Sequence, residues 1–302
     1  MIMLDGIFNV YKEKGYTSHD VVAKLRGIAG QRKIGHTGTL DPDAEGVLPV
    51  CLGKATRVCD VLADKSKTYR TVLLLGRRTD TQDISGACLE EKETAALTEA
   101  QVREAVESFQ GVYMQTPPMY SALKVNGRKL YELAREGKTV ERKARPVEIS
   151  RIRILKMELP RVWMEVDCSK GTYIRTLCDD IGRKLGVGGC MEELLRTRVG
   201  EFSIGDSIRL SELEALREQG GLESRLMPVD SVFASYRRAD AGAEEEPLLW
   251  NGNPLRLPGV QKDVRDRELV RVYDREGRFV ALYRYDEKGG VFRTEKMFFS
   301  RR

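Results

Sequence analysis

The sequence predicts an α+β fold, with a core of mixed or antiparallel sheet, peripheral helices and a small C-terminal β-domain. Apolar and polar residues largely alternate over 147–154 and 162–168, as in two half-exposed strands of an antiparallel pair. Capping-box patterns at 98–101 and 211–214 predict the starts of two helices. A hairpin pattern over 268–283 follows a segment rich in Ala, Gly, Asp and Glu. Together these features indicate helices packed on a sheet, with a separate β-rich unit at the end of the chain.

The first part of the chain alternates between apolar runs and turn-forming residues. We predict a strand over 4–11, then a helix to about residue 28, which Thr17 or Ser18 caps and Gly30 ends. Residues 35–46 form an irregular loop, and the apolar run 47–52 returns the chain to a buried strand or short helix. A buried strand over 68–76 and a polar loop over 77–86 complete this part.

The second part contains the predicted helices and the domain boundary. Helices are expected from the capping box at 98 to about 109, over 128–135, over 174–185 and after residue 211. A last strand is expected near 291–299. The segment 237–247 is expected to be a linker. We therefore divide the chain into a catalytic domain, 1–237, with a basic insertion at 117–147, and a C-terminal β-domain, 238–302.

Bulk composition excludes several classes of protein. With 41% hydrophobic and 32% charged residues in 302, the chain has an ordinary globular composition. It has no apolar run of the roughly 20 residues that a membrane span requires and no basic, apolar leader. Its six cysteines are scattered without a Cys-x-x-Cys pair, which argues against a zinc site or a disulfide framework. We expect a cytoplasmic protein with reduced cysteines, no metal and no membrane partner.

Positive charge is concentrated in one segment. Residues 124–145 include eight basic and only three acidic residues, whereas the whole chain carries a net charge of only +5. Such a patch attracts a polyanion, although a charge run is also typical of a solvated helix face. The candidate contacts to an RNA backbone are Lys124, Arg128, Lys129, Arg142 and Lys143.

The most unusual stretch is GHTGTLDPDAEGVLPV at 35–50, which holds three glycines, two prolines, three acids and one of the two histidines. One interpretation is a turn in which Asp41 and Asp43 make local hydrogen bonds. A calcium loop is excluded, because its twelfth position would be Leu52 rather than a glutamate. The third interpretation is a nucleophilic or acid–base aspartate on a rigid loop. Motif spacing alone supports the first and the third interpretation about equally.

Five ordered motifs resemble one known family. The stretch 35–50 is similar to the signature loop of the TruB family of tRNA pseudouridine-55 synthases. Four further blocks within about residues 5–230 resemble the family's motifs in the same order: KTY at 67–69, PPMYSALK at 117–124, GTYIRT at 171–176 and LLRTRVG at 194–200. The chain departs from the family pattern at Glu13, Glu45 and Leu195. The C-terminal part is similar in pattern to a PUA-like β-domain.

The resemblance implies a pseudouridine synthase core and a set of site residues. Asp41 would be the nucleophile, Arg175 its ionic partner, and Tyr69 a ring that stacks on the target base and serves as general base. Tyr173 and Leu194 would form walls of the base pocket. His36 would occupy the space left by the extruded uridine. The expected reaction converts uridine to pseudouridine in the T-loop of tRNA, without a cofactor, and we expect a standalone monomer that binds the T-arm.

Three alternatives remain open. The chain could be an RNA-binding or RNA-folding protein without chemistry, for which Asp41→Asn would have no effect. It could be a glycoside or nucleoside hydrolase that uses Asp41 with Asp43 or Glu45 as a carboxylate pair and releases free uracil. It could also be the guide-RNA-dependent catalytic subunit of a related synthase, although the chain lacks long basic tails and carries its own basic patch.

Overall fold

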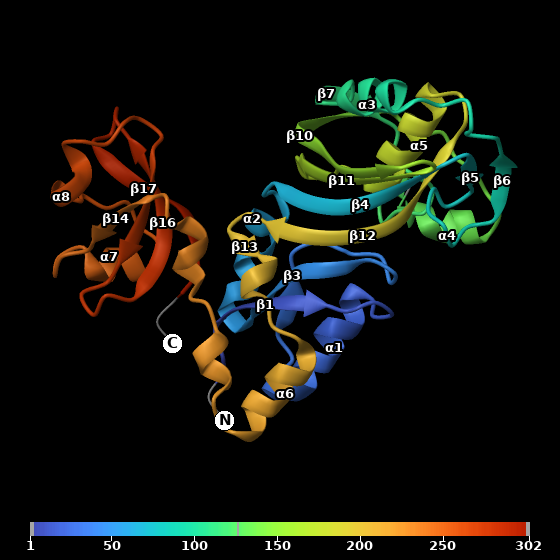
Figure 1. Ribbon diagram of the computed structural model, residues 1–302. Coiled ribbons are helices and arrows are strands. Elements are labelled where there is room, and N and C mark those ends of the chain that lie inside the picture. The colour runs from blue at the N-terminus through green and yellow to red at the C-terminus, as the bar shows by residue number, and fades with distance from the viewer. Residues whose placement is uncertain (1–2, 126, 300–302) are drawn as a thin grey trace.

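The computed structural model describes residues 3–125 and 127–299, and it confirms the predicted α+β class (Figure 1). A nine-stranded sheet runs through the larger part of the molecule in the order β1-β3-β12-β4-β11-β10-β7, with β2 paired to β3 and β13 to β12. Its strands are β1 (Gly6–Lys12), β2 (Ile34–His36), β3 (Glu45–Leu52), β4 (Lys67–Leu75), β7 (Gly111–Gln115), β10 (Arg145–Glu158), β11 (Arg161–Cys168), β12 (Gly189–Val199) and β13 (Phe202–Ser203).

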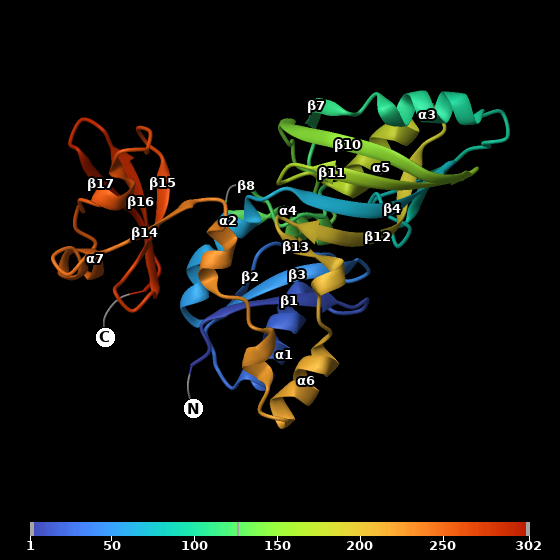
Figure 2. The ribbon, with the colours of Figure 1, turned by 60° about the vertical axis from the view of Figure 1, so that its left-hand side comes forward.

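Two groups of helices cover different parts of this sheet. Near β1 and β3, α1 and α6 lie against each other and enclose a hydrophobic cluster with these strands (Figure 2). Near β4, β10 and β11, α3 and α5 enclose a second cluster. The helices and 3₁₀ turns of this larger part are α1 (Ser18–Ala29), η1 (Gly53–Val58), α2 (Cys59–Ala63), α3 (Glu99–Glu107), α4 (Leu130–Arg135), α5 (Ile174–Lys184), η2 (Ile204–Asp206), α6 (Leu210–Glu218), η3 (Leu222–Arg225) and η4 (Val229–Phe233).

Strand β12 joins the two halves of the sheet. It pairs antiparallel with β4 along most of its length, but it pairs parallel with β3 at only two positions, Leu195 with Glu45 and Arg196 with Gly46. We predicted no strand here from the sequence. Such a short parallel contact between distant segments leaves no local pattern, because it depends on pairing over about 150 residues of sequence.

Two short hairpins lie outside the main sheet. Strands β5 (Arg77–Thr79) and β6 (Cys88–Glu91) form one, so the loop predicted over 77–86 begins with a strand. Strands β8 (Lys124–Val125) and β9 (Arg128–Lys129) form the other, inside the basic insertion. The helix predicted over 128–135 therefore begins only at Leu130, because the first two residues of that range pair as a strand.

The C-terminal β-domain contains a four-stranded sheet in the order β14-β15-β16-β17. Its elements are β14 (Arg237–Asp240), α7 (Glu246–Trp250), α8 (Pro258–Gln261), β15 (Leu269–Tyr273), β16 (Phe279–Asp286) and β17 (Val291–Met297). The predicted hairpin and last strand are confirmed, but the predicted linker over 237–247 is wrong. Its first residues pair in parallel with β15, and the small side chains of Ala239 and Ala241 are buried in the domain core.

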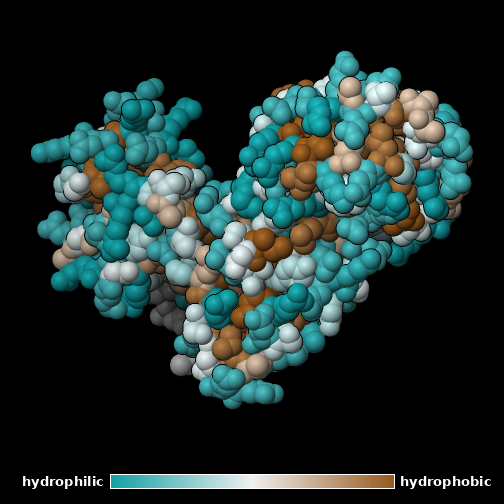
Figure 3. All heavy atoms as spheres, in the orientation of Figure 1, coloured by the Kyte–Doolittle hydropathy of each residue, from teal (hydrophilic) through white to brown (hydrophobic). Residues whose placement is uncertain are grey.

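The two domains share a hydrophobic cluster. Phe279 and Phe298 of the C-terminal domain pack with Val47 and Cys51 of β3. The guanidinium of Arg57 also donates to the carbonyl oxygens of Met297 and Phe298, both at 3.1 Å. Away from this contact the domain stands apart from the rest of the molecule, and a hollow separates the two lobes in Figure 3.

Helix ends test the local predictions. Thr17 caps α1 in a reciprocal hydrogen-bonding arrangement with Asp20, and Gly30 ends the helix in the left-handed conformation, as predicted. The capping box at Thr98 and Gln101 is also confirmed. The box predicted at 211–214 is wrong, because α6 begins at Leu210 and the carboxylate of Glu212 accepts the backbone N–H of Arg209. Within the part of the chain that the structure describes, no helix is both long and apolar enough to cross a bilayer.

Candidate active site

The loop between β2 and β3 is fixed to the fold at several points. The amine of Lys12, which is fully buried, donates to the carbonyl oxygens of Ala44 (2.6 Å), Pro42 (3.1 Å) and Glu13 (3.1 Å). The backbone N–H of Leu40 donates to the Ser18 hydroxyl at 2.9 Å. Because both flanks of Asp41 are hydrogen-bonded to other elements, the loop presents this carboxylate from a rigid support.

Asp41 forms an ion pair with Arg175, with 3.0 Å between Oδ2 and Nε. Arg175 lies at the start of α5, about 130 residues away in sequence, and its side chain is only 7% exposed. The two side chains that the sequence motifs single out are therefore brought together. An adjacent guanidinium fixes the direction in which the carboxylate oxygens point.

Arg175 also connects Asp41 to two other segments. Its Nη1 donates to the carbonyl oxygen of Thr81 at 3.1 Å and lies 3.8 Å from the carboxylate of Asp83. Its Nη2 donates to the carbonyl oxygen of Tyr120 at 2.8 Å, at the beginning of the basic insertion. One guanidinium thus holds three segments in a fixed relation: the loop after β5, the insertion, and residues 37–44 between β2 and β3. We call residues 37–44 the nucleophile loop, after the role expected of Asp41.

Tyr69 and Leu194 lie beside the loop, on the neighbouring strands β4 and β12. Both belong to, or pack against, the hydrophobic cluster that includes Leu40 and Ala44 of the loop. Burial raises the pKa of Tyr69, and the guanidinium of Arg196 acts in the opposite direction. Tyr173 precedes α5, where the Gln115 side chain accepts its backbone N–H at 2.8 Å and donates to its carbonyl oxygen at 3.0 Å.

His36 occupies the last position of β2. Its Nδ1 accepts the backbone N–H of Gly38 at 3.3 Å, and its ring meets that of His19 edge-on, with 5.3 Å between centroids. Burial lowers the pKa of His36, and nearby His19 and Arg196 lower it further. A neutral, half-buried ring of this kind is suited to stacking on a nucleobase.

The carboxylate of Asp41 is partly open to solvent. Its side chain is 41% exposed. Apolar walls are present on one side, formed by the cluster that contains Leu40, Ala44 and Tyr69, and the other side faces outward. The carboxylate is therefore enclosed on one side only.

The basic residues of the insertion differ in how they are held. Lys124 and Lys143 are exposed and form no ion pair within the described residues. Arg128 is paired with Glu136, and Lys129 lies beside the ring and hydroxyl of Tyr131. Arg142 is half buried and donates to the carbonyl oxygen of Pro117 at 3.1 Å, so it braces the base of the insertion.

The departures from the family pattern are accommodated without touching Asp41. Glu13 is ion-paired with Arg209 of the segment before α6. The Glu45 carboxylate accepts the Tyr11 hydroxyl at 3.3 Å, and Leu195 pairs with Glu45 across the short parallel contact between β12 and β3.

Sequence reasoning missed three charged side chains at this site: Lys12, Asp83 and Arg196. Lys12 ends a strand and Asp83 lies in a polar loop, so neither stands out by its type or position. Arg196 lies within one of the matched motifs, but without the pairing of β12 nothing indicated that its side chain points into the core.

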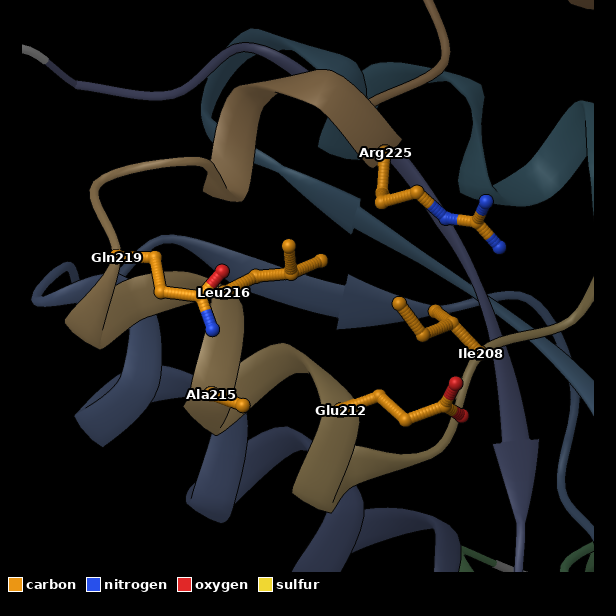
Figure 4. A pocket seen from close by; sticks show the side chains of 6 residues that line it. All are labelled: Ile208, Glu212, Ala215, Leu216, Gln219 and Arg225. Carbon is orange, nitrogen blue, oxygen red and sulfur yellow. The ribbon is translucent and has the colours of Figure 1, made fainter.

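A cavity elsewhere takes no part in this site. It has a volume of about 360 Å³, lies between α6 and η3, and is lined by Ile208, Glu212, Ala215, Leu216, Gln219 and Arg225 (Figure 4). None of these residues belongs to the nucleophile loop or to the strands that carry Tyr69 and Leu194.

Known proteins resemble the chain throughout this arrangement. Residues 26–174 match the model of the TruB family pseudouridylate synthase N-terminal domain, and residues 175–234 match that of the tRNA pseudouridylate synthase B C-terminal domain. The tRNA pseudouridine synthase B of Lachnoclostridium phytofermentans is 52% identical, with 98% of this chain and 100% of that protein covered. The enzyme of the same name from Clostridium tetani is 41% identical, with 95% and 97% covered.

Solved structures show a similar fold at lower identity. A structure of an H/ACA RNP bound to a substrate RNA containing 2′-deoxyuridine has a chain 25% identical to this one, with a TM-score of 0.73 and coverage of 98% of this chain and 86% of the other. A chain of a Cbf5–Nop10–Gar1 complex is 26% identical, with a TM-score of 0.70 and coverage of 98% and 85%. From its motifs, its fold and these relatives, the chain belongs to the TruB family of pseudouridylate synthases.

Proposed function

We propose that the protein isomerises uridine to pseudouridine at position 55, in the T-loop of tRNA, as a standalone and cofactor-free enzyme. The observation that carries the proposal is the Asp41–Arg175 ion pair on a loop fixed by Lys12. The family membership and the names of its relatives support the choice of tRNA as substrate. An isomerisation of this kind neither gains nor loses atoms or electrons, so it requires no external reactant.

The proposed chemistry exchanges one bond for another. The bond between N1 of uracil and C1′ of ribose breaks, and a bond between C5 and C1′ forms. C5 gives up its proton, and N1 ends with one. Asp41 forms the covalent intermediate, which holds the fragments during the exchange. Arg175 orients the carboxylate through its ion pair.

The remaining side chains hold the nucleotide. We assign Tyr69 to stacking on the base and to removal of the C5 proton, with Tyr173 and Leu194 as further walls of the pocket. His36 occupies the place of the extruded uridine in the RNA. Lys124, Arg128, Lys129 and Lys143 attract the phosphates of the T-arm, with Arg142 bracing the insertion, and they supply affinity rather than choice of sequence.

The open face of Asp41 fits this assignment. An extruded uridine that lies against Tyr69 and Leu194 would cover the exposed side of the carboxylate and exclude water from it. The pocket is then completed by the substrate itself. This accounts for a nucleophile that is accessible in the free protein.

The direct test is incubation with an unmodified tRNA transcript, followed by mapping of pseudouridine. The wild-type protein alone should convert position 55, and Asp41→Asn should bind the transcript but leave it unmodified. A requirement for an added guide RNA would replace the standalone assignment with the guide-dependent one. Release of free uracil would indicate a hydrolase, and equal behaviour of wild type and Asp41→Asn would indicate an RNA-binding protein without chemistry.

A further inference from the structure

Arg196 is a buried cation that has none of the roles assigned above. It lies on β12, is 2% exposed, and is among the largest fully buried side chains of the described residues. Within residues 3–125 and 127–299 it has no Asp or Glu oxygen within ion-pair distance, so its charge is balanced by neutral acceptors. Burying a guanidinium without a carboxylate is costly unless hydrogen bonds compensate.

Its acceptors come from both ends of the nucleophile loop. Nε donates to the carbonyl oxygen of Val47 at 2.7 Å, and Nη2 approaches that of Gly38 at 3.4 Å. These two residues bracket Asp41. The backbone is equally close, since Gly46 has φ +108° and a Cβ there would lie 2.2 Å from the carbonyl oxygen of Arg196. Any larger residue at 46 would push the loop off the strand.

The tyrosine of the site is the third group beside Arg196. Arg196 and Tyr69 are direct partners in the pairing of β12 with β4, so their side chains lie on the same face of the sheet. The guanidinium also acts to lower the pKa of Tyr69, against the effect of burial. A guanidinium has only donors, so Tyr69 can meet it only with its oxygen as the acceptor.

We propose that Arg196 is a positioning residue that sets the distance and orientation between Asp41 and Tyr69, by binding the two ends of the nucleophile loop and the tyrosine hydroxyl with one planar group. The inference rests on the proposed function, because it concerns the relative placement of the two groups that act on the uridine. Arg196 lies at the short parallel contact through which β12 joins the two halves of the sheet. The proposed link between Asp41 and Tyr69 therefore passes through this contact.

The consequence concerns turnover rather than affinity. Arg196 lies beneath the loop and the tyrosine, whereas the proposed phosphate contacts lie on the insertion. If the loop and Tyr69 lose their common support, a displacement of about 1 Å between reacting groups lowers the rate by about 100-fold. RNA binding depends on other residues and is expected to stay within about twofold.

The test compares substitutions at Arg196 with one at Arg198, two residues along the same strand. Arg198 also makes several hydrogen bonds, to Thr68, Ser66 and Gly200, but none to the nucleophile loop within the described residues. Arg196→Met, Arg196→Lys and Arg198→Met are assayed for kcat and KM on an unmodified tRNA transcript, for transcript binding, and for thermal unfolding. Wild type and Asp41→Asn are run beside them.

Arg196→Met is expected to lose about 100-fold in kcat with KM within about twofold, and Arg198→Met to retain the wild-type kcat. Arg196→Lys keeps the buried charge but lacks the planar fork, so it should recover only part of the lost rate. In a Tyr69→Phe background, Arg196→Met should cost less than in the wild type, because the hydroxyl that Arg196 is proposed to position is already absent.

Any of three results would overturn the inference. A folded Arg196→Lys or Arg196→Met variant could have the wild-type kcat. The variants could lose only in KM, or the effect of Arg196→Met could be fully additive with that of Tyr69→Phe. If Arg196→Met does not fold, Arg196→Lys decides the question by the same criteria. A wild-type protein that forms no pseudouridine would instead refute the proposed function, which separates the two failures.

Discussion

The nucleophile loop and the basic insertion both concentrate positive charge, and they hold it in opposite ways. Around the loop, Lys12, Arg175 and Arg196 are buried, and most of their hydrogen bonds end on backbone carbonyl oxygens. In the insertion, Lys124 and Lys143 project into solvent. A buried cation with several carbonyl acceptors fixes geometry, because each acceptor has a set direction and distance. An exposed cation supplies a field with little directional preference.

This difference predicts that RNA affinity and catalytic rate depend differently on salt concentration. Exposed charges more than about 10 Å apart are screened at 0.1 M salt, whereas buried hydrogen-bonded charges are screened far less. Substitutions near the loop should therefore change the rate at every salt concentration. Substitutions in the insertion should change binding, and most strongly at low salt.

Arg175→Met should have the largest effect. It removes the ionic partner of Asp41 and the donor to the Tyr120 carbonyl oxygen, so we expect single-turnover conversion to fall by about 100- to 1000-fold. Transcript binding should change by less than about threefold, and the rate loss should be the same at 50 and 200 mM salt. The matched control is Arg183→Met, which removes an exposed arginine from the same helix. A loss that appeared in binding alone, or that vanished at high salt, would contradict the comparison.

Lys12→Met should mainly lower stability. The substitution removes the lysine donor from three carbonyl oxygens of the loop region, at a cost of about 2 kcal/mol in the free energy of unfolding. The oxygens of Pro42 and Glu13 keep a backbone donor, so most of the cost falls on Ala44. Urea unfolding at pH 7.5 measures this cost. Lys14→Met, which alters an exposed lysine in the following turn, is the control and should change the free energy by less than about 0.5 kcal/mol.

The cost of Lys12→Met should also depend on pH. Burial lowers the pKa of Lys12 to about 8, against 10.5 for an ordinary lysine. Between these values the unfolded chain binds more protons than the folded one, so wild-type stability gains from this group as pH rises. The variant lacks that gain, and its deficit should widen between pH 8 and pH 10. A deficit that narrowed over this range would show that Lys12 is not held as the structure indicates.

Local chemistry determined which parts of this fold could be predicted from the sequence. Thr17 and Gly30 define the ends of α1 through hydrogen bonds and backbone angles that belong to single residues. The alternation in β10 follows from one buried and one exposed face. In β11 the polar face is covered as well, because Glu165 is buried beneath ion pairs with Arg70 and Arg153. The pairing of Asp41 with Arg175 was expected only from the family resemblance, because no local pattern connects residues so far apart in sequence.

The predictions failed where a contact depends on distant residues. The Ala, Gly, Asp and Glu content of 237–247 indicated a linker, but the backbone of 237–240 pairs with β15, which composition does not reveal. Arg196 looks like any charged residue until β12 is placed between β3 and β4. In the insertion, the sequence named five candidate cations without ranking them. Only the structure separates the exposed Lys124 and Lys143 from Arg128 and Arg142, which already have partners.

That separation makes the next prediction specific. Lys124→Ala combined with Lys143→Ala should weaken transcript binding by about 10-fold at 0.1 M salt and reduce the slope of log K against log salt by about 1 to 2. The rate at saturating RNA should not change. Arg103→Ala, which removes an exposed cation from α3, serves as the control. An unchanged salt slope in the double variant would mean that these lysines do not meet the RNA backbone.

Arg128→Ala should have the smallest effect of the set, although Arg128 lies on the same hairpin as Lys124. Its guanidinium is paired with Glu136, which also accepts Lys138 at 2.8 Å, and hydrogen bonds from Arg128 and Lys138 lower the pKa of this carboxyl to about 2. The acid therefore stays ionised at every pH of interest and offsets part of the positive field. Filter binding should show a loss of less than about twofold for Arg128→Ala. Glu136→Gln releases both cations and should tighten binding by about two- to threefold at low salt. If Arg128→Ala weakened binding as much as the lysine substitutions, the ion pair would have to open on the RNA, and pairing in the free protein would not predict which cations bind phosphate.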